Sequence, residues 1–399
     1  MAPVRGRAPA ARPQLLREMN EQVLLDLIRA DGPLSRADLA RMTGLSKPTV
    51  SLALANIERA GLVRSAGLRT GVPGPAAILY EVRPDCGYVL GLDVGRQFMR
   101  AAVADMSGAV RARRSIPVTA TDGPSRVAEL TALAAGVLDE SNVTQADITQ
   151  TVIGSPGVYY PQRDALALSG SLPGWGVPAV LSELRTAFGP SVMIENDLNV
   201  AALAERAHGH GRDVHSFAFV SIGTGIGMGL VIDGTLHRGA HGTAGEIGYL
   251  PFSEGHGADD EDARERGSFE AASSAAAVVR AAQRAGLDET WSARDVFAAA
   301  LDGNAAAAAV VAEQALLVAK AICAVITVVD PELIVLGGGI GQAPGFVDAV
   351  AAELKAFAPV IPEVRVSALG ADAVLDGCLA AGLDRAWALL TAAVPGPGL

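Results

Sequence analysis

The chain has 399 residues, half of them hydrophobic, and a net charge of −11. This length is enough for two or three domains with buried cores. We find no uninterrupted apolar run of about 18 residues and no apolar secretory segment behind the basic N-terminus, so we expect neither a membrane span nor export. The three cysteines lie far apart in apolar surroundings, which is typical of buried thiols in a cytoplasmic protein.

Charge is unevenly distributed along the chain. Residues 1–80 carry 11 Lys or Arg against 6 Asp or Glu, a balance of +5, so the rest of the chain carries −16. A basic N-terminal part attached to an acidic body indicates a module that binds a polyanion.

The N-terminal part has the pattern of a helix-turn-helix. We expect a flexible basic arm over residues 1–14 and then a helix with apolar residues at helical spacing. A Ser-Arg-Ala-Asp sequence at residues 35–38 is a capping-box-like start for a short second helix. A turn containing Gly44 follows, and Ser46 caps a third helix whose first turn tolerates proline.

Two short strands, at residues 62–64 and 78–82, flank a Gly/Pro-rich tip and complete a winged unit over residues 15–83. A major groove accepts the start of such a third helix, and the wing contacts phosphates. The residues that we expect at DNA are Ser46, Lys47, Thr49 and Ser51 of the helix and Arg64 and Arg69 of the wing. The alternative is a helical bundle used for dimerisation. Residues 35–61 resemble the winged helix-turn-helix of the ROK family (repressors, open reading frames and sugar kinases).

The rest of the chain contains two copies of one β-hairpin unit. A strand at 88–94 ends at a glycine corner and returns over 98–104, and a strand at 217–222 ends at a second glycine corner and returns over 230–232. Such a repeat predicts a duplicated α/β fold with a cleft between its halves. The set resembles the two-lobed actin-like ATPase (ribonuclease H-like) fold of sugar kinases. We expect a first lobe over 84–200, completed by a C-terminal helix at 375–392, and a second lobe over 201–374.

Glycines alternate at positions 223, 225, 227 and 229. With the strand period of two they leave one face bare, so that another group can approach the backbone closely. Position 228 is Met, which excludes a dinucleotide fingerprint. In ROK kinases the similar segment cradles phosphate. The resemblance implies a vestigial phosphate site at Asp93, Gly95, Gly223, Thr224, Gly225, Gly227 and Gly338.

The Glu-Asn-Asp sequence at 195–197 stands between an apolar strand and an amphipathic helix. Corners of this kind bind ligands in open α/β sheets. Asn196 or Asp197 could simply cap the helix, or Asp197 could accept a hydrogen bond from a sugar hydroxyl. The resemblance to ROK kinases implies the second role. It implies a sugar site formed by Ser169, Ser171, Asn196, Asp197, Glu246 and Glu270.

Two departures from the ROK kinases concern cofactors. Their Asp-x-Gly-Gly-Thr corner reads Asp-Val-Gly-Arg-Gln here, so Arg96 could occupy the γ-phosphate position or pair with Asp93 or Asp197. In either case we expect no ATP. The family's zinc loop is also altered, because Tyr249 replaces a histidine and residues 251–267 contain no cysteine. We expect no zinc, and we interpret His208, His210 and His215 as surface residues.

The sequence therefore predicts a cytoplasmic, sugar-responsive transcriptional regulator that acts as a repressor and has no kinase activity. Its predicted partners are double-stranded operator DNA, a sugar or sugar derivative and further copies of itself, as a homodimer or homotetramer, with no membrane. One alternative is an ATP-dependent sugar kinase with a DNA-binding head, in which Asp197 is the general base. A regulator that responds to a partner protein is the other.

Overall fold

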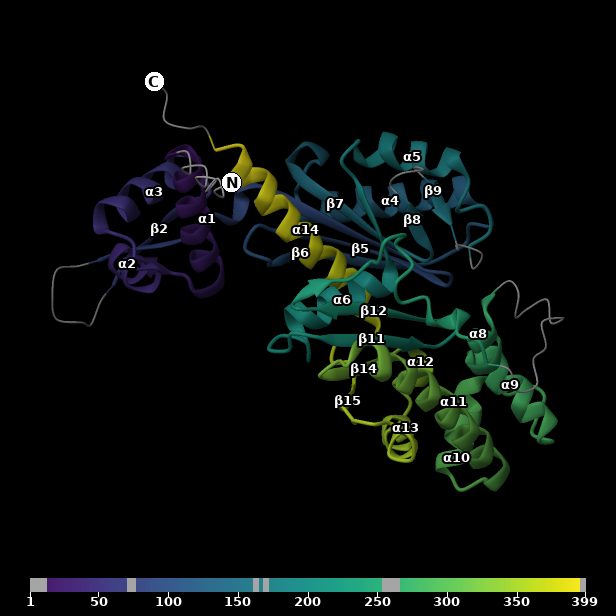
Figure 1. The fold of residues 1–399 in the computed structure, drawn as a ribbon. Helices are drawn as coiled ribbons and strands as arrows, with labels where there is room; N and C mark the ends of the chain where they lie inside the picture. The colour runs from purple at the N-terminus through teal and green to yellow at the C-terminus, as the bar shows by residue number, and fades with distance from the viewer. Residues whose placement is uncertain (1–12, 70–76, 161–164, 168–171, 253–265, 395–399) are drawn as a thin grey trace, which may run out of the picture.

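In this computed structural model, the structure describes residues 13–69, 77–160, 165–167, 172–252 and 266–394. A small head of helices and a short sheet comes first, and two lobes follow, each built around a five-stranded sheet (Figure 1). The expected arm over residues 1–14 lies almost entirely outside the described residues, as do Ser169 and Ser171 and most of the segment expected to have lost zinc.

The head has the expected winged helix-turn-helix order. Its elements are α1 (Pro13–Asp31), β1 (Leu34–Ser35), α2 (Arg36–Thr43), α3 (Lys47–Arg59), β2 (Val63–Leu68) and β3 (Ile78–Val82). Ser35 starts α2 in a capping box, Gly44 ends it in the left-handed conformation, and Ser46 caps α3. Both predicted helix starts are confirmed. Leu24, Leu39 and Leu54 are fully buried between the three helices.

The first lobe has the sheet order β10-β7-β4-β5-β6. Its elements are β4 (Tyr88–Val94), β5 (Phe98–Asp105), β6 (Val110–Pro117), α4 (Gly123–Ser141), β7 (Ile148–Ser155), β8 (Val158–Tyr160), β9 (Ala165–Ala167), α5 (Pro178–Phe188) and β10 (Met193–Asn196). The alternate residues Leu90 and Leu92 of β4 pack in one apolar cluster with α4 and α5, whereas Val89 belongs to the cluster on the opposite face. The sheet is therefore covered on both sides, as central strands require.

The second lobe repeats this arrangement with the order β15-β14-β11-β12-β13. Its elements are β11 (Phe217–Ile222), β12 (Ile226–Ile232), β13 (Thr235–Leu236), α8 (Ser268–Ser273), α9 (Ala275–Arg284), α10 (Ala293–Leu301), α11 (Ala305–Val329), β14 (Leu333–Gly337), α12 (Gly338–Gly341), α13 (Phe346–Leu354) and β15 (Glu363–Val366). In both lobes an antiparallel hairpin lies beside a parallel strand, β7 beside β4 and β14 beside β11. The predicted duplication is confirmed.

Two helices, α6 (Asp197–His208) and α14 (Ala373–Ala392), connect the lobes (Figure 1). They cross so closely that a Cβ placed at Gly377 would lie 1.8 Å from the carbonyl oxygen of Val200. Further along α14, a Cβ at Gly382 would lie 2.3 Å from Val89 of β4. Because these glycines allow contact at the backbone, α14 is tightly packed against both α6 and the first sheet.

Helix α11 is long and apolar enough to cross a membrane by length and composition, with a mean hydropathy of 2.0 over its most apolar window. Half of that window is buried within the fold. Val318 and Ile322 are fully buried in the core of the second lobe, which accounts for the apolar composition without a bilayer.

Candidate ligand cleft and DNA-binding face

A cavity of about 1620 Å³ lies where the glycine corners of the two lobes face each other. This volume exceeds the usual range for a small-molecule site, roughly 300–1,000 Å³. Most of the predicted ligand-site residues line it: Gly95, Asn196, Asp197, Gly223, Thr224, Gly225, Gly227, Glu246, Glu270 and Gly338. The tertiary structure thus brings together residues that are far apart in sequence.

Asn196 and Asp197 have different positions at this corner. Asn196 caps α6, because its Oδ1 accepts hydrogen bonds from the backbone N–H groups of Leu198 and Asn199 at 2.9 and 3.2 Å. Its Nδ2 donates to the carbonyl oxygen of Gly157 at 3.1 Å. Asp197 accepts only from its neighbour Leu198, through Oδ1 at 3.0 Å, and no hydrogen bond from a described residue reaches its Oδ2. The capping interpretation is therefore correct for Asn196, and Asp197 is left facing the cavity.

Glu195 is a structural member of the same corner that the sequence pattern did not single out. Its Oε1 accepts from the side chain of Asn199 at 2.8 Å, and its Oε2 accepts from the guanidinium of Arg238 at 2.6 Å. The carboxylate is nearly buried. Because each carboxylate oxygen has its own donor, Glu195 fixes the end of β10, which directly precedes Asp197.

Two carboxyl groups that line the cavity, Asp197 and Glu246, and the neighbouring Asp93 have raised pKa values. Burial, with the charge of Asp93 as the second cause, raises the pKa of Asp197 to about 7. Burial also raises the pKa of Asp93 to about 6, against the opposing effect of its hydrogen bond from Arg100. The pKa of Glu246 is raised by burial and by the charge of Glu270. The carboxylates of the cleft are thus largely removed from water. The hydroxyl groups of a ligand could donate the hydrogen bonds that water would otherwise provide.

Glu270 has a clear structural partner. Its Oε2 accepts a hydrogen bond at 2.8 Å from the backbone N–H of Ile226, the first residue of β12. It also lies 3.2 Å from where a Cβ on Gly225 would be. Glu270 therefore connects α8 to the glycine corner of the second lobe.

At the glycine corner of the first lobe, Asp93 pairs with an arginine, but with Arg100 and not with Arg96. Arg100 donates to Asp93 at 2.7 Å, since the β4–β5 hairpin places these two residues directly opposite each other. Arg96 is exposed at the cavity edge and forms no ion pair with Asp93 or Asp197 in the described structure. The sequence could have predicted the Asp93–Arg100 pair, because residues at equal distances from the turn face each other in an antiparallel hairpin.

The alternating glycines of the second corner serve two purposes. A Cβ on Gly229 would lie 2.2 Å from the carbonyl oxygen of Leu198, and one on Gly227 would lie 2.6 Å from the side chain of Leu198. The group that approaches these two glycines is therefore helix α6. The close approach that the glycines were expected to allow is therefore made by α6 at these two positions, while Gly223, Gly225 and Gly227 also line the cavity.

Residues that would form the family's zinc site are absent from the sequence, which has only three cysteines, at positions 86, 323 and 378. Protein contacts hold the described ends of this segment together. Ser268 of α8 donates to the carbonyl oxygen of Leu250 at 2.9 Å and accepts from the N–H of Phe252 at 2.8 Å, and Phe252 stacks on Phe269 at 4.8 Å.

The three histidines predicted to be surface residues lie between the end of α6 and the start of β11. His208 and His215 are exposed, and Nδ1 of His210 is 3.1 Å from the guanidinium of Arg365.

On the head, the start of α3 is accessible. Ser46 and Lys47 are exposed, and Thr49 and Ser51 are half-buried beside them. The hydroxyl groups of Ser46 and Thr49 are hydrogen-bonded to each other at 2.8 Å. These side chains form one surface at the helix end, which is the part of a recognition helix that reaches base edges.

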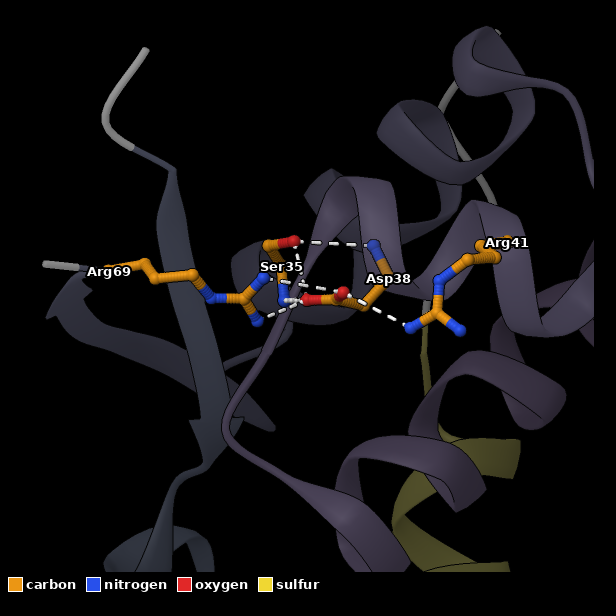
Figure 2. A network of polar contacts seen from close by, with 4 residues as sticks. All are labelled: Ser35, Asp38, Arg41 and Arg69. Carbon is orange, nitrogen blue, oxygen red and sulfur yellow. Dashed lines mark hydrogen bonds and ion pairs between the residues drawn. The ribbon is translucent and has the colours of Figure 1, made fainter. Parts of the chain in front are cut away.

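The two predicted wing arginines both have carboxylate partners. Arg64 of β2 donates to Glu81 of β3 at 2.8 Å. Arg69, which follows β2, donates to Asp38 of α2 at 2.5 Å (Figure 2). The sequence did not predict either pair, because both arginines were expected to be exposed phosphate contacts.

Fold and cleft together define a two-lobed protein of the actin-like ATPase class with a winged helix-turn-helix head. The chain belongs to the ROK family, whose sequence profile matches residues 89–380. Residues 14–77 match the Crp-like helix-turn-helix domain.

Relatives of known name include both repressors and kinases. The xylose repressor of Bacillus subtilis (strain 168) is 26% identical over 238 residues, which is 59% of this chain and 61% of that protein. The putative xylose repressor of Caldicellulosiruptor sp. (strain Rt8B.4) is 28% identical over 59% of each chain. The chain thus spans about three fifths of the length of these repressors. The glucokinase of Halalkalibacterium halodurans is 28% identical over 73% of this chain and 93% of the kinase.

Solved structures support the predicted fold. A ROK family transcriptional regulator that is a homolog of the E. coli MLC protein matches with a TM-score of 0.77 and 23% identity, over 94% of this chain and 98% of that chain. The ROK hexokinase from Thermus thermophilus matches with a TM-score of 0.64 and 28% identity, over 75% of this chain and 99% of the hexokinase. The predicted head followed by a kinase-like body is confirmed as the fold.

Proposed function

We propose that the protein is a transcriptional regulator, acting as a repressor, that binds operator DNA through its head and a sugar or sugar derivative in its cleft. The observation that carries this proposal is the carboxylate-lined cleft, centred on Asp197, on the same chain as a winged helix-turn-helix. The names of the related xylose repressors support it. A cytoplasmic location follows from this function.

Contacts with DNA are assigned to α3 and the wing. Ser46, Lys47, Thr49 and Ser51 read base edges, and Arg64 lies where the flanking phosphates are expected. A homodimer or homotetramer presents two heads to a palindromic operator, because operator symmetry mirrors protein symmetry.

Sugar recognition is assigned to Asp197, Glu246 and Glu270, with Asn196 fixing the corner. Ser169 and Ser171, which the resemblance adds to this site, lie outside the described residues. A buried carboxylate oxygen without a donor is costly, so a sugar hydroxyl that donates to Oδ2 of Asp197 relieves that cost. The raised pKa values of Asp197 and Glu246 support this assignment.

We infer that kinase activity has been lost and that neither ATP nor zinc is a cofactor. A phosphoryl-transfer site needs a carboxylate free to hold Mg²⁺ beside the phosphates. Asp93, the carboxylate of that corner, is already paired with Arg100. The residual phosphate site, including Gly95, Gly223, Thr224, Gly225, Gly227 and Gly338, is then a vestige.

A sugar kinase with a DNA-binding head is the second candidate, and one observation favours it. Asp197 has a pKa of about 7, which suits a general base at neutral pH. The glucokinase that matches over 73% of this chain also fits this function. A coupled assay of ATP hydrolysis over a panel of hexoses separates the two candidates. Turnover on the order of 1 s⁻¹ or faster would establish the kinase.

Helix α14 provides a physical connection between the cleft and the head. Ala373 and Val374, at its start, line the cavity. Twenty residues make the helix about 30 Å long, and its far end reaches α1 (Figure 1). There Trp387 is buried in an apolar cluster that it shares with Leu24 and Ile28 of α1.

A polar contact accompanies this apolar one. The guanidinium of Arg29 lies 5.2 Å from the ring of Trp387 and donates to Asp384 at 3.2 Å. We infer that a sugar closing the cleft shifts α14 and so changes the position of the head relative to its copy in the oligomer. The shift needs a difference in sugar affinity between the open and closed states.

The decisive experiment measures DNA affinity of the full chain with and without sugars found by a melting-temperature screen. The DNA probe is a sequence that the protein itself selects from a pool of random double-stranded DNA. The regulator requires affinity that falls steeply with salt and changes when the sugar is added. Salt-insensitive binding, or no selected sequence, would exclude it.

A further inference from the structure

An ion pair joins the base of the wing to the second helix of the helix-turn-helix. Asp38 lies in the first turn of α2 and is nearly buried. It accepts from Arg69 through both oxygens, Oδ2 from Nη2 at 2.5 Å and Oδ1 from Nη1 at 3.4 Å. Figure 2 shows Asp38 lying between Arg69 of the wing and Arg41 of α2. Parallel guanidinium–carboxylate contacts of this kind restrict both distance and angle.

Asp38 itself is held rigidly. Its Oδ2 accepts from the N–H and the hydroxyl of Ser35 at 3.0 and 2.7 Å, and its own N–H donates to the Ser35 hydroxyl at 3.2 Å. Arg41 donates to Oδ1 at 3.4 Å. Hydrogen bonds from Arg69, the largest cause, and from Ser35, together with the charge of Arg69, lower the pKa of Asp38. The carboxylate therefore stays ionised and fixed in direction.

Arg69 occupies a defined place on the wing. Its backbone N–H donates to the carbonyl oxygen of Ala77 at 2.8 Å, which joins the two sides of the hairpin just before residues 70–76. Its side chain runs toward Asp38 of α2 (Figure 2). The hairpin also contacts this part of the head through the two-residue strand β1, where Ser35 pairs with Leu79, and through Arg36 of α2, whose guanidinium lies 5.4 Å from the ring of Tyr80.

We propose that Asp38 is a positioning residue for DNA binding. Through Arg69 it sets the angle between the wing and the recognition helix, and Arg69 acts in this ion pair and not as a phosphate contact. A wing held at a fixed angle loses little conformational freedom when it meets DNA, so the ion pair raises affinity without touching the nucleic acid. The proposal rests on DNA binding by the head, and it revises the role first expected of Arg69.

The two roles of Arg69 predict opposite results for Asp38→Asn. Asparagine keeps an acceptor for Ser35 but loses the charge that binds Arg69. If the ion pair positions the wing, Asp38→Asn and Arg69→Ala each weaken binding to the selected DNA severalfold, and the double variant is no weaker than either single one. If Arg69 contacts phosphate, Asp38→Asn frees it, and affinity stays the same or increases.

Salt dependence gives an independent measurement. Loss of one phosphate contact reduces the slope of log affinity against log salt by about 0.9. We expect Arg69→Ala to leave the slope unchanged. Arg69→Lys, which keeps the charge but not the planar fork, should weaken binding in the same way as Arg69→Ala. A reduced slope, or wild-type affinity in Arg69→Lys, would overturn the proposal.

Ser35→Ala is the control for helix capping. It removes the cap of α2 and leaves Arg69 beside Asp38, so a loss of affinity due to α2 alone would appear in it to the same extent. Circular dichroism identifies any variant that has not folded. Hydroxyl-radical footprints of the folded Asp38→Asn protein should lose protection at the flanks while the central groove stays protected. If the wild-type chain binds no DNA, the proposed function fails; if it binds and these variants match it, only the positioning role fails.

Discussion

Replacing Asp197 by asparagine tests the physical basis of the cleft. In the folded protein the pKa of Asp197 is about 7, against an ordinary value of 3.8. A carboxyl group with a raised pKa stabilises the fold below its unfolded pKa, and this contribution is lost as pH rises through the folded value. Above pH 7, a pKa difference of this size lowers the free energy of unfolding by at most about 4 kcal/mol.

An asparagine side chain does not ionise, so Asp197→Asn should avoid this cost. Between about pH 5 and about pH 8 the free energy of unfolding of the wild type should fall by about 2–3 kcal/mol relative to that of the variant. Urea titrations followed by tryptophan fluorescence measure it, because Trp175 and Trp387 are both buried. Asp213→Asn, an exposed position with the same charge change, is the control.

The same variant separates stability from recognition. A sugar that donates to the Asp197 carboxylate must bind the ionised form, so wild-type sugar affinity should rise with pH until about pH 7 and then level off. Asp197→Asn should be more stable than the wild type at high pH and should lose the melting-temperature shift caused by the sugar. A pH-independent stability difference, or a retained shift, would refute the reasoning.

Three further predictions concern other parts of the chain. Arg29→Ala, which removes both polar contacts between head and α14, should leave sugar binding and DNA binding separately intact but reduce the effect of sugar on DNA affinity, measured by fluorescence anisotropy. Gly229→Ala should lower the free energy of unfolding by about 1–3 kcal/mol or more, because its Cβ would meet the carbonyl oxygen of Leu198 at 2.2 Å, whereas Gly339→Ala, with open space around it, should not. Lys47→Ala should relax the sequence preference, measured by selection from random DNA. Its affinity for unrelated sequences should fall only by the amount expected for the loss of one positive charge.

Local features of the head followed from sequence with little ambiguity. Three residues of the head each fix a helix end through contacts within four residues: Ser35, Gly44 and Ser46. The duplicated hairpins of the body were equally visible, because strand, glycine corner and return strand are adjacent in the chain. Local hydrogen bonding and side-chain period decide such elements, so one sequence is enough to predict them.

Contacts between distant segments were decided only by the tertiary structure. The sequence predicted Asp197, Glu246 and Glu270 as one site by resemblance, but the raised pKa values depend on burial and on neighbours that no spacing reveals. Arg69 was predicted to contact DNA and instead pairs with Asp38, and only the tertiary structure shows that the group close to Gly229 is helix α6. A side chain's charge and size are written in the sequence. Which partner it meets depends on how the sheets and helices pack, since packing sets the distances on which electrostatic and steric energies depend.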